Sequence, residues 1–144
     1  MSESNKLLSR RFTELFSTDD VSLADDVFTG GVVFHNAVAG GDLQGVEAVK
    51  EFIAAYRTAF PDARSTVEDQ VADGDTVATR WRARGTHHGP LGELPATGRE
   101  FVMDGITIER IEGGRIAEVW VARDELGLMQ QLGAIPAPRG AGAA

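Results

Sequence analysis

The sequence predicts an α+β fold, in which a strongly curved antiparallel β-sheet with helices on its concave face would enclose a cavity. Two observations lead to this prediction. Helical patterns come early in the chain and alternating strand patterns come late, which is typical of α+β proteins rather than of parallel, doubly wound sheets. The late strands are joined by short connections, which favour antiparallel neighbours.

The first part of the chain is predicted to hold two helices, a strand and a loop. Apolar residues recur at helical spacing in residues 5–16, so one face of a first helix is expected to be buried. Residues 21–26 fit a short second helix, and the second half of residues 27–36 fits a first strand. The Gly-rich residues 37–43 are expected to form a loop.

The clearest helix is predicted at residues 45–60, where apolar side chains form a continuous stripe and Pro61 ends the pattern. Residues 64–72 and 76–88 alternate as strands on either side of a short turn. In the second of these strands the aromatic and small residues share one side and the arginines share the other, if no bulge intervenes. The arginine side is expected to be the outer face of the sheet.

A long hairpin and a closing helix are predicted near the end of the chain. Residues 101–111 and 115–122 fit two strands, and glycines in the turn between them accept the positive φ of a tight hairpin. Asp124 is a possible N-cap of a helix over residues 125–132. This hairpin is expected to form the back wall of the pocket.

Length and composition indicate one small globular domain. We expect residues 1–135 to form it and residues 136–144, which are small and flexible, to form a C-terminal tail. With 14 basic and 22 acidic side chains the net charge is −8, which argues against nucleic-acid or membrane partners. Cysteine is absent, so disulfides and thiolate metal sites are excluded. No signal peptide or membrane-spanning run is apparent, so the expected location is the cytoplasm.

Short motifs follow one another in an order typical of a known family. They are GTHHG at 85–89, PATGR at 95–99, GITIER at 105–110, GGRIAEVW at 113–120, Asp124, and QLG at 131–133. Together they resemble the SnoaL-like polyketide cyclases, which belong to the cone-shaped nuclear transport factor 2-like superfamily. The similarity spans about residues 7–135. It implies an α+β barrel, a deep apolar pocket, and a homodimer or homotetramer formed through the outer face of the sheet.

The resemblance also implies a reaction and its residues. The characterised cyclases close a ring by an intramolecular aldol condensation without a metal or organic cofactor, using an Asp as general acid and base beside a His and a Gln. In this chain those three positions hold Val121, Thr107 and Gly105, respectively. Val cannot transfer a proton, and Thr is a hydrogen-bonding group rather than a base near neutral pH. The predicted mechanism is therefore non-standard and relies on the shape of the pocket.

Asp124 and His35 are the catalytic candidates that the sequence still offers. Asp124 is either the N-cap of the last helix or a carboxylate at the mouth of the pocket. His35 and Asn36 end the first strand, at the open side of a cone, where a titratable His can act as a base or orient a ligand carbonyl. Asn36 is included as a ligand-binding candidate. Adjacent His87 and His88 point to opposite faces of a strand without an apparent third ligand, so no metal site is expected.

Five further residues are predicted to bind the ligand. Tyr56, Trp81 and Met103 are expected where the core borders the cavity, and Tyr56 adds a hydroxyl that can orient a ligand oxygen. Thr107 and Val121 are expected on the pocket side of the hairpin.

Two acidic residues of the same hairpin are expected to face opposite ways. Glu109 shares the pocket side with Thr107 and is a candidate acid if it is buried; otherwise it is solvated near the end of the hairpin. Asp104 faces the other way, where Arg80, Arg82 or Arg84 can pair with it.

The predicted function is that of a cofactor-independent enzyme that cyclises or otherwise tailors a polyketide-like apolar metabolite. Hydroxylation with the help of a partner reductase is a variant of this prediction. A non-catalytic binding or carrier module for an apolar ligand is an alternative. A hydrolase or isomerase in which His35 and Asp124 form the working pair is another.

Overall fold

A computed structural model describes residues 2–38 and 41–136 of the chain. The helices are α1 (Ser2–Glu14), α2 (Ala24–Val27), α3 (Val46–Ala59) and α4 (Glu125–Gln131), with short 3₁₀ turns η1 (Leu15–Ser17) and η2 (Val21–Leu23). The strands are β1 (Phe28–Val38), β2 (Gly41–Gln44), β3 (Arg64–Asp73), β4 (Thr76–Thr86), β5 (Glu100–Glu112) and β6 (Arg115–Arg123). Of the predicted tail only Pro136 is among the described residues, so both domain boundaries stay predictions.

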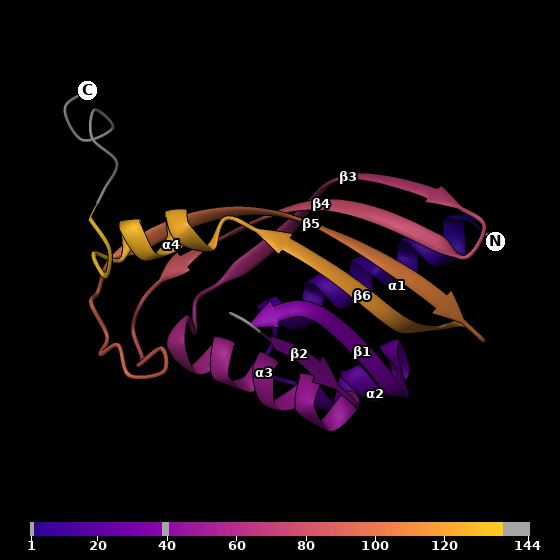
Figure 1. The fold of residues 1–144 in the computed structure, drawn as a ribbon, viewed down its shortest axis with the longest axis horizontal. Coiled ribbons are helices and arrows are strands. Elements are labelled where there is room, and N and C mark those ends of the chain that lie inside the picture. Colours follow the sequence, from indigo (N-terminus) through magenta and orange to yellow (C-terminus); the bar gives the residue numbers. More distant parts are fainter. Residues whose placement is uncertain (1, 39–40, 137–144) are drawn as a thin grey trace.

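The strands form one open mixed sheet in the order β2-β1-β6-β5-β4-β3 (Figure 1). The α+β class is confirmed, but the expectation of a wholly antiparallel sheet was wrong at one pairing. β1 and β6 run parallel, with Phe34 beside Val119, whereas the other neighbours are antiparallel. A parallel pair joins segments that are far apart in the sequence, so no local pattern indicates it. The barrel implied by the family resemblance is an open sheet in the described part of the chain.

The predicted loop at residues 37–43 was also partly wrong, because residues 37–38 belong to β1 and residues 41–43 belong to β2. Phe34 of β1 pairs with Leu43 of β2, and the register shifts just beyond this pair. Asn36 has a φ of 62°, a left-handed conformation that Asn tolerates better than most residues. Gly and Asp are rare in strands, so the sequence of β2 gave no strand signal.

The hairpin of β5 and β6 was predicted correctly. Inward and outward side chains alternate along β5, and Thr107 lies opposite Val121 on β6. Gly113 and Gly114 form the turn with φ values of 59° and 79°. Both angles lie in the left-handed region that a two-residue hairpin turn requires and that glycine adopts without a steric penalty.

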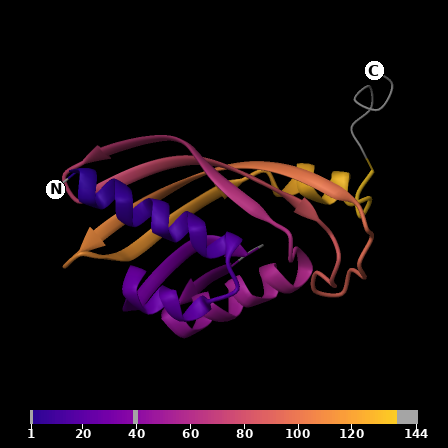
Figure 2. The ribbon, with the colours of Figure 1, turned by 180° about the vertical axis from the view of Figure 1, so that it is seen from behind.

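The sheet arches over α1 and α3, and α4 covers one end of it (Figure 2). Two groups of buried apolar side chains hold these layers together. One joins α1, α2, α3 and β1 around Phe12, Phe28 and Phe34. The other joins the end of α3 to β4, β5 and α4 around Phe60 and Phe101. Within the described residues no helix is long and apolar enough to cross a membrane.

Candidate functional site

A cavity of about 320 Å³ lies between the two groups of core side chains. Its volume is within the range of natural small-molecule sites. Aromatic rings supplied by α1, β1, the α3 segment and β4 form much of its wall: Phe12, Phe34, Phe52, Tyr56, Phe60 and Trp81. Phe12 and Phe34 meet edge to face with ring centroids 5.5 Å apart. Such rings are stiff and present flat apolar surfaces, which suits a planar, largely apolar ligand.

The structure brings five of the predicted ligand-binding residues together on this wall. They are Tyr56, Trp81, Met103, Thr107 and Val121. Burial raises the pKa of the Tyr56 hydroxyl to about 12, so the hydroxyl stays protonated near neutral pH and serves as a hydrogen-bonding group rather than a base. Contact of the five residues with a ligand stays a prediction.

Trp81 lies directly across Gly105 on the neighbouring strand. The two residues are partners in the register of β4 and β5, and a Cβ atom at position 105 would overlap the indole ring. The indole therefore occupies the space that a side chain at position 105 would need. A Gln at this position, as the family resemblance would lead one to expect, is incompatible with the observed place of Trp81. The cavity wall has an indole where an amide was expected.

Arg123 and Glu125 are the basic and the acidic side chain of the described cavity lining. The Nη2 group of Arg123 donates to the backbone oxygen of Ala37 and lies 3.2 Å from Oε1 of Glu125. The guanidinium carbon lies 5.5 Å from the centre of the Phe52 ring, within the range of a cation–π contact. These contacts hold a cation at the wall of an apolar cavity. We did not predict Arg123, although alternation along β6 places it on the same face as Val121.

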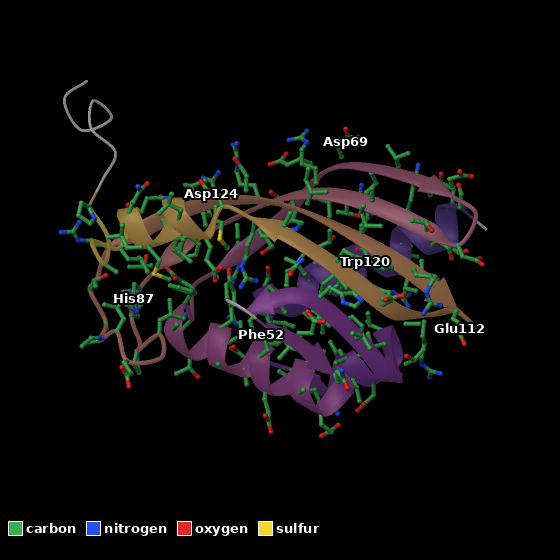
Figure 3. The ribbon with its side chains drawn as sticks, viewed as in Figure 1. Phe52, Asp69, His87, Glu112, Trp120 and Asp124 are labelled. Carbon is green, nitrogen blue, oxygen red and sulfur yellow. The ribbon has the colours of Figure 1, made fainter. Side chains whose placement is uncertain are left out.

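Asp124 caps α4 and is exposed, where β6 meets the helix (Figure 3). Its Oδ1 accepts a hydrogen bond from the backbone nitrogen of Gly127 at 2.9 Å. Asp124 is not among the described residues that line the cavity. The structure therefore favours the capping interpretation, and the catalytic role of Asp124 stays a prediction that its position does not support.

His35 lies on the opposite side of the sheet from the cavity. Side chains alternate along β1, so Phe34 faces the cavity and His35 faces outward. Its Nε2 lies 2.6 Å from Oε2 of Glu118, its Nδ1 lies 3.2 Å from Oδ2 of Asp42, and its ring stacks on Trp120. The hydrogen bond to Glu118, ahead of the contacts with Asp42, raises the pKa of His35.

Neither His35 nor its neighbour Asn36 is among the described lining residues. Asn36 is exposed, and its backbone nitrogen donates to Asp42. None of the hydrogen bonds and ion pairs of the described residues joins His35 to Asp124. The roles of His35 and Asn36 stay predictions, and the arrangement does not support the hydrolase or isomerase pair.

Glu109 is fully buried under α1, so of the two predicted environments the buried one is correct. Its Oε1 accepts hydrogen bonds from Ser9 at 2.5 Å and from Thr107 at 3.3 Å. Burial raises the pKa of Glu109 to about 7, against the lowering effect of these hydrogen bonds. Thr107 also lines the cavity, so this carboxyl group is one hydroxyl away from it.

The predicted pairing of Asp104 on the outer face is confirmed, since Arg82 binds both of its carboxylate oxygens at 2.7 and 3.3 Å. His87 is buried, and its Nδ1 accepts a hydrogen bond from the backbone nitrogen of Thr97 at 3.2 Å, whereas His88 is exposed. The described residues contain no cluster of three or more His, Cys, Asp or Glu side chains arranged to hold a metal ion.

Comparison with known proteins finds one family over nearly the whole chain. The sequence profile of the SnoaL-like polyketide cyclases matches residues 6–132. The chain is 31% identical over 140 residues to aklanonic acid methyl ester cyclase DnrD of Streptomyces peucetius, covering 92% of this chain and 94% of that protein. Among solved structures, TsrD of Streptomyces laurentii is 29% identical with a TM-score of 0.85, covering 94% and 98% of the two chains. Wild-type IdmH of Streptomyces antibioticus is 31% identical with a TM-score of 0.78, covering 90% and 98%.

Proposed function

Because the chain belongs to the SnoaL-like polyketide cyclase family, we propose that its cavity binds a polycyclic, largely apolar polyketide and promotes an intramolecular ring closure. The observation that carries this proposal is the aromatic cavity, whose described lining contains one cationic side chain, Arg123. The proposed reaction needs no metal or organic cofactor. It differs from the reaction of the characterised cyclases in proceeding without an Asp at position 121, a His at 107 or a Gln at 105.

Part of the proposed rate enhancement comes from the shape of the cavity. A flexible chain attached to a flat ring system must fold back on itself before a carbon–carbon bond can form. Flat aromatic walls hold the ring system, so the chain has fewer conformations and reaches its attack geometry more often. Trp81 strengthens this effect, because the indole narrows the space above Gly105.

Arg123 is proposed to stabilise the negative charge that develops during ring closure. An aldol reaction passes through an enolate, whose oxygen carries most of the charge. Within the described residues, both hydrogen bonds of the guanidinium use Nη2, which leaves its Nε and Nη1 groups for a ligand oxygen. Glu125 balances the charge of Arg123 before the ligand arrives, and Phe52 fixes the plane of the guanidinium.

The first test uses aklanonic acid methyl ester, the compound for which relatives of this chain are named. The wild-type protein should convert it to a cyclised product, measured by liquid chromatography and mass spectrometry. Arg123→Gln should lower kcat about 100-fold, because a charged donor at the enolate oxygen is lost. Arg115→Gln, an exposed position at the other end of β6, is the matched control and should keep wild-type activity. Wild-type activity in the Arg123 variant would contradict the role of Arg123.

A carrier of the same class of ligand is the second candidate function. It is favoured by the fact that the charged groups of the described cavity lining, Arg123 and Glu125, pair with each other. A carrier should bind aklanonic acid methyl ester with quenching of Trp81 fluorescence and release it unchanged. Binding without turnover at any pH between 5 and 9 would replace the enzyme proposal with this one.

We also propose that a second copy of the chain covers the outer face of the sheet. Val102, Ile106, Ile108 and Trp120 are exposed there, on β5 and β6. Arg82 beside them is paired with Asp104 within one chain, whereas Arg80 and Arg84, the register partners of Ile106 and Val102, have no ion pair among the described residues. An apolar centre with a polar rim is the usual anatomy of such an interface.

Trp120→Glu should convert a dimer or tetramer into a monomer, because it places a charge at the centre of this face. Light scattering coupled to size-exclusion chromatography measures the change in mass. Leu126→Glu, at an exposed apolar position on α4, should leave the mass of the assembly unchanged. A wild-type protein that is monomeric at 100 μM would rule the interface out.

A further inference from the structure

Glu109 is a buried carboxyl group without a charged partner in the described part of the chain. Its side chain is inaccessible to solvent, and its Oε2 has no hydrogen-bond partner among the described residues. Burial raises the pKa of Glu109, and hydrogen bonds from Ser9, Thr107 and its own backbone lower it. Isolated buried carboxyls are costly, so one that is a single hydroxyl group away from a cavity is a candidate for proton transfer.

The hydrogen-bond and register partners of Glu109 among the described residues are neutral. Ser9 comes from α1 and Thr107 from the same strand. Val77 on β4 and Val119 on β6 are its partners in the sheet register, and both are buried. The Glu109 carboxylate is therefore neutralised by taking up a proton.

A row of hydroxyl groups allows Glu109 to hold or release a proton without breaking the network. With Glu109 ionised, Gln70 donates to Thr79, Thr79 to Ser9, and Ser9 to the carboxylate, at 3.2, 2.7 and 2.5 Å. With Oε1 protonated, the carboxyl group can donate to Ser9 and Ser9 to Thr79, because each hydroxyl both donates and accepts. The same heavy-atom positions therefore serve both protonation states.

Thr107 connects this carboxyl group to the cavity. It lines the cavity, and its hydroxyl lies 3.3 Å from Oε1 of Glu109. The other ionisable groups of the described lining are less suited to accept a proton from a carbon atom. Tyr56 is already protonated, and Glu125 is partly exposed and paired with Arg123.

We propose that Glu109 takes up and returns the proton of the ring closure, acting through the hydroxyl of Thr107; this rests on the proposed function. The substrate C–H bond breaks, its proton passes to Oγ1 of Thr107, and the hydroxyl proton of Thr107 passes to Oε1 of Glu109. The electron pair of the C–H bond forms the enolate, which makes the new carbon–carbon bond to the acceptor carbonyl. The resulting alkoxide then takes a proton from Thr107, and Glu109 returns one to Thr107. Atoms and charges balance, and no other reactant is consumed.

The first experiment measures kcat for aklanonic acid methyl ester between pH 5 and pH 9. The wild-type rate should rise with pH to a plateau, because Glu109 must lose its proton to act as a base. Glu109→Gln and Thr107→Val should each lower kcat at least 100-fold and abolish that rise. Thr107→Ser keeps the hydroxyl and should restore the rate to within a few-fold of wild type. Glu125→Gln should keep the rise with pH.

The second experiment does not depend on turnover. Infrared difference spectra follow the carboxylic C=O band of Glu109 during a pH titration, with Glu109→Gln identifying the band. Binding of 1,8-dihydroxyanthraquinone, a flat apolar probe, should shift this band in the wild-type protein, because the probe contacts Thr107. Thr107→Val should keep the titration and lose most of the shift.

The outcomes separate the two proposals. The inference is overturned if Glu109→Gln keeps the wild-type rate and pH profile. It is also overturned if the rise of kcat with pH disappears in Glu125→Gln instead. In both cases the proposed function is unaffected. If aklanonic acid methyl ester is not turned over, the proposed function fails for this substrate. The connection between Glu109 and the cavity is still supported if the probe shifts the infrared band of Glu109 and Thr107→Val removes that shift. A band that the probe leaves unchanged overturns the inference in either case.

Discussion

Glu109→Gln should raise the free energy of unfolding at pH 8 by roughly 3 kcal/mol, since about 1.4 kcal/mol corresponds to each pKa unit. The pKa of Glu109 is about 7 in the folded chain, whereas its ordinary value is 4.5. Between these two pH values the folded protein holds a proton that the unfolded chain has lost. Stability therefore falls as pH rises from 4.5 to 7 and then levels off. Gln resembles the protonated acid in shape and charge, so the variant avoids this loss.

Urea unfolding at pH 5 and pH 8 measures the effect. The variant should gain stability over wild type at pH 8 and be close to wild type at pH 5. His35 also has a raised pKa and makes stability fall with rising pH, so the difference between wild type and variant isolates Glu109. Glu112→Gln, at an exposed position on the same strand, should change stability by less than about 0.5 kcal/mol at both pH values. An equal effect of Glu109→Gln at pH 5 and pH 8 would contradict the assignment.

Arg57→Met should lower the free energy of unfolding by about 3 to 5 kcal/mol, because several buried hydrogen bonds are lost together. The Arg57 side chain is 8% exposed. It donates to the backbone oxygens of Phe16, Ala63 and Pro61 at 3.2, 3.0 and 2.7 Å, and its Nε donates to Asp19 at 3.0 Å. Met fills much of the space but offers no donor, so the three carbonyl groups would be left without this partner.

Chemical denaturation of the variant checks this expectation. Arg64→Met is the matched control, because Arg64 is exposed although it also donates to the oxygen of Ala63. It should cost less than about 1 kcal/mol. An equal loss of unfolding free energy in the two variants would show that burial does not make the Arg57 hydrogen bonds more stabilising than the exposed one of Arg64. Because Arg57 joins the end of α3 to η1 and the start of β3, the Arg57 variant should also bind ligands in the cavity more weakly.

Local patterns in the sequence were sufficient for the α+β class, for α3, and for the hairpin of β5 and β6. In each case the signal is a repeat that the backbone geometry imposes, close to 3.6 residues in the helix and 2 in the strands. The same alternation placed Thr107 and Val121 on the cavity side and Asp104 on the outer side. It failed for β2, because Gly and Asp gave no strand signal there and the partner strand supplied the pairing.

The burial of individual side chains and the pairing of distant strands depended on how the helices and strands pack together. Alternation assigned Glu109 to the inner side but left its burial open, and α1, about a hundred residues earlier in the chain, is what covers it. The parallel pairing of β1 with β6 likewise joins distant segments. Such contacts form between side chains that share no local repeat, so a single sequence leaves them undetermined until the layers are assembled. The residues on which the proposed chemistry depends most, Arg123 and Glu109, acquire their environments from this assembly.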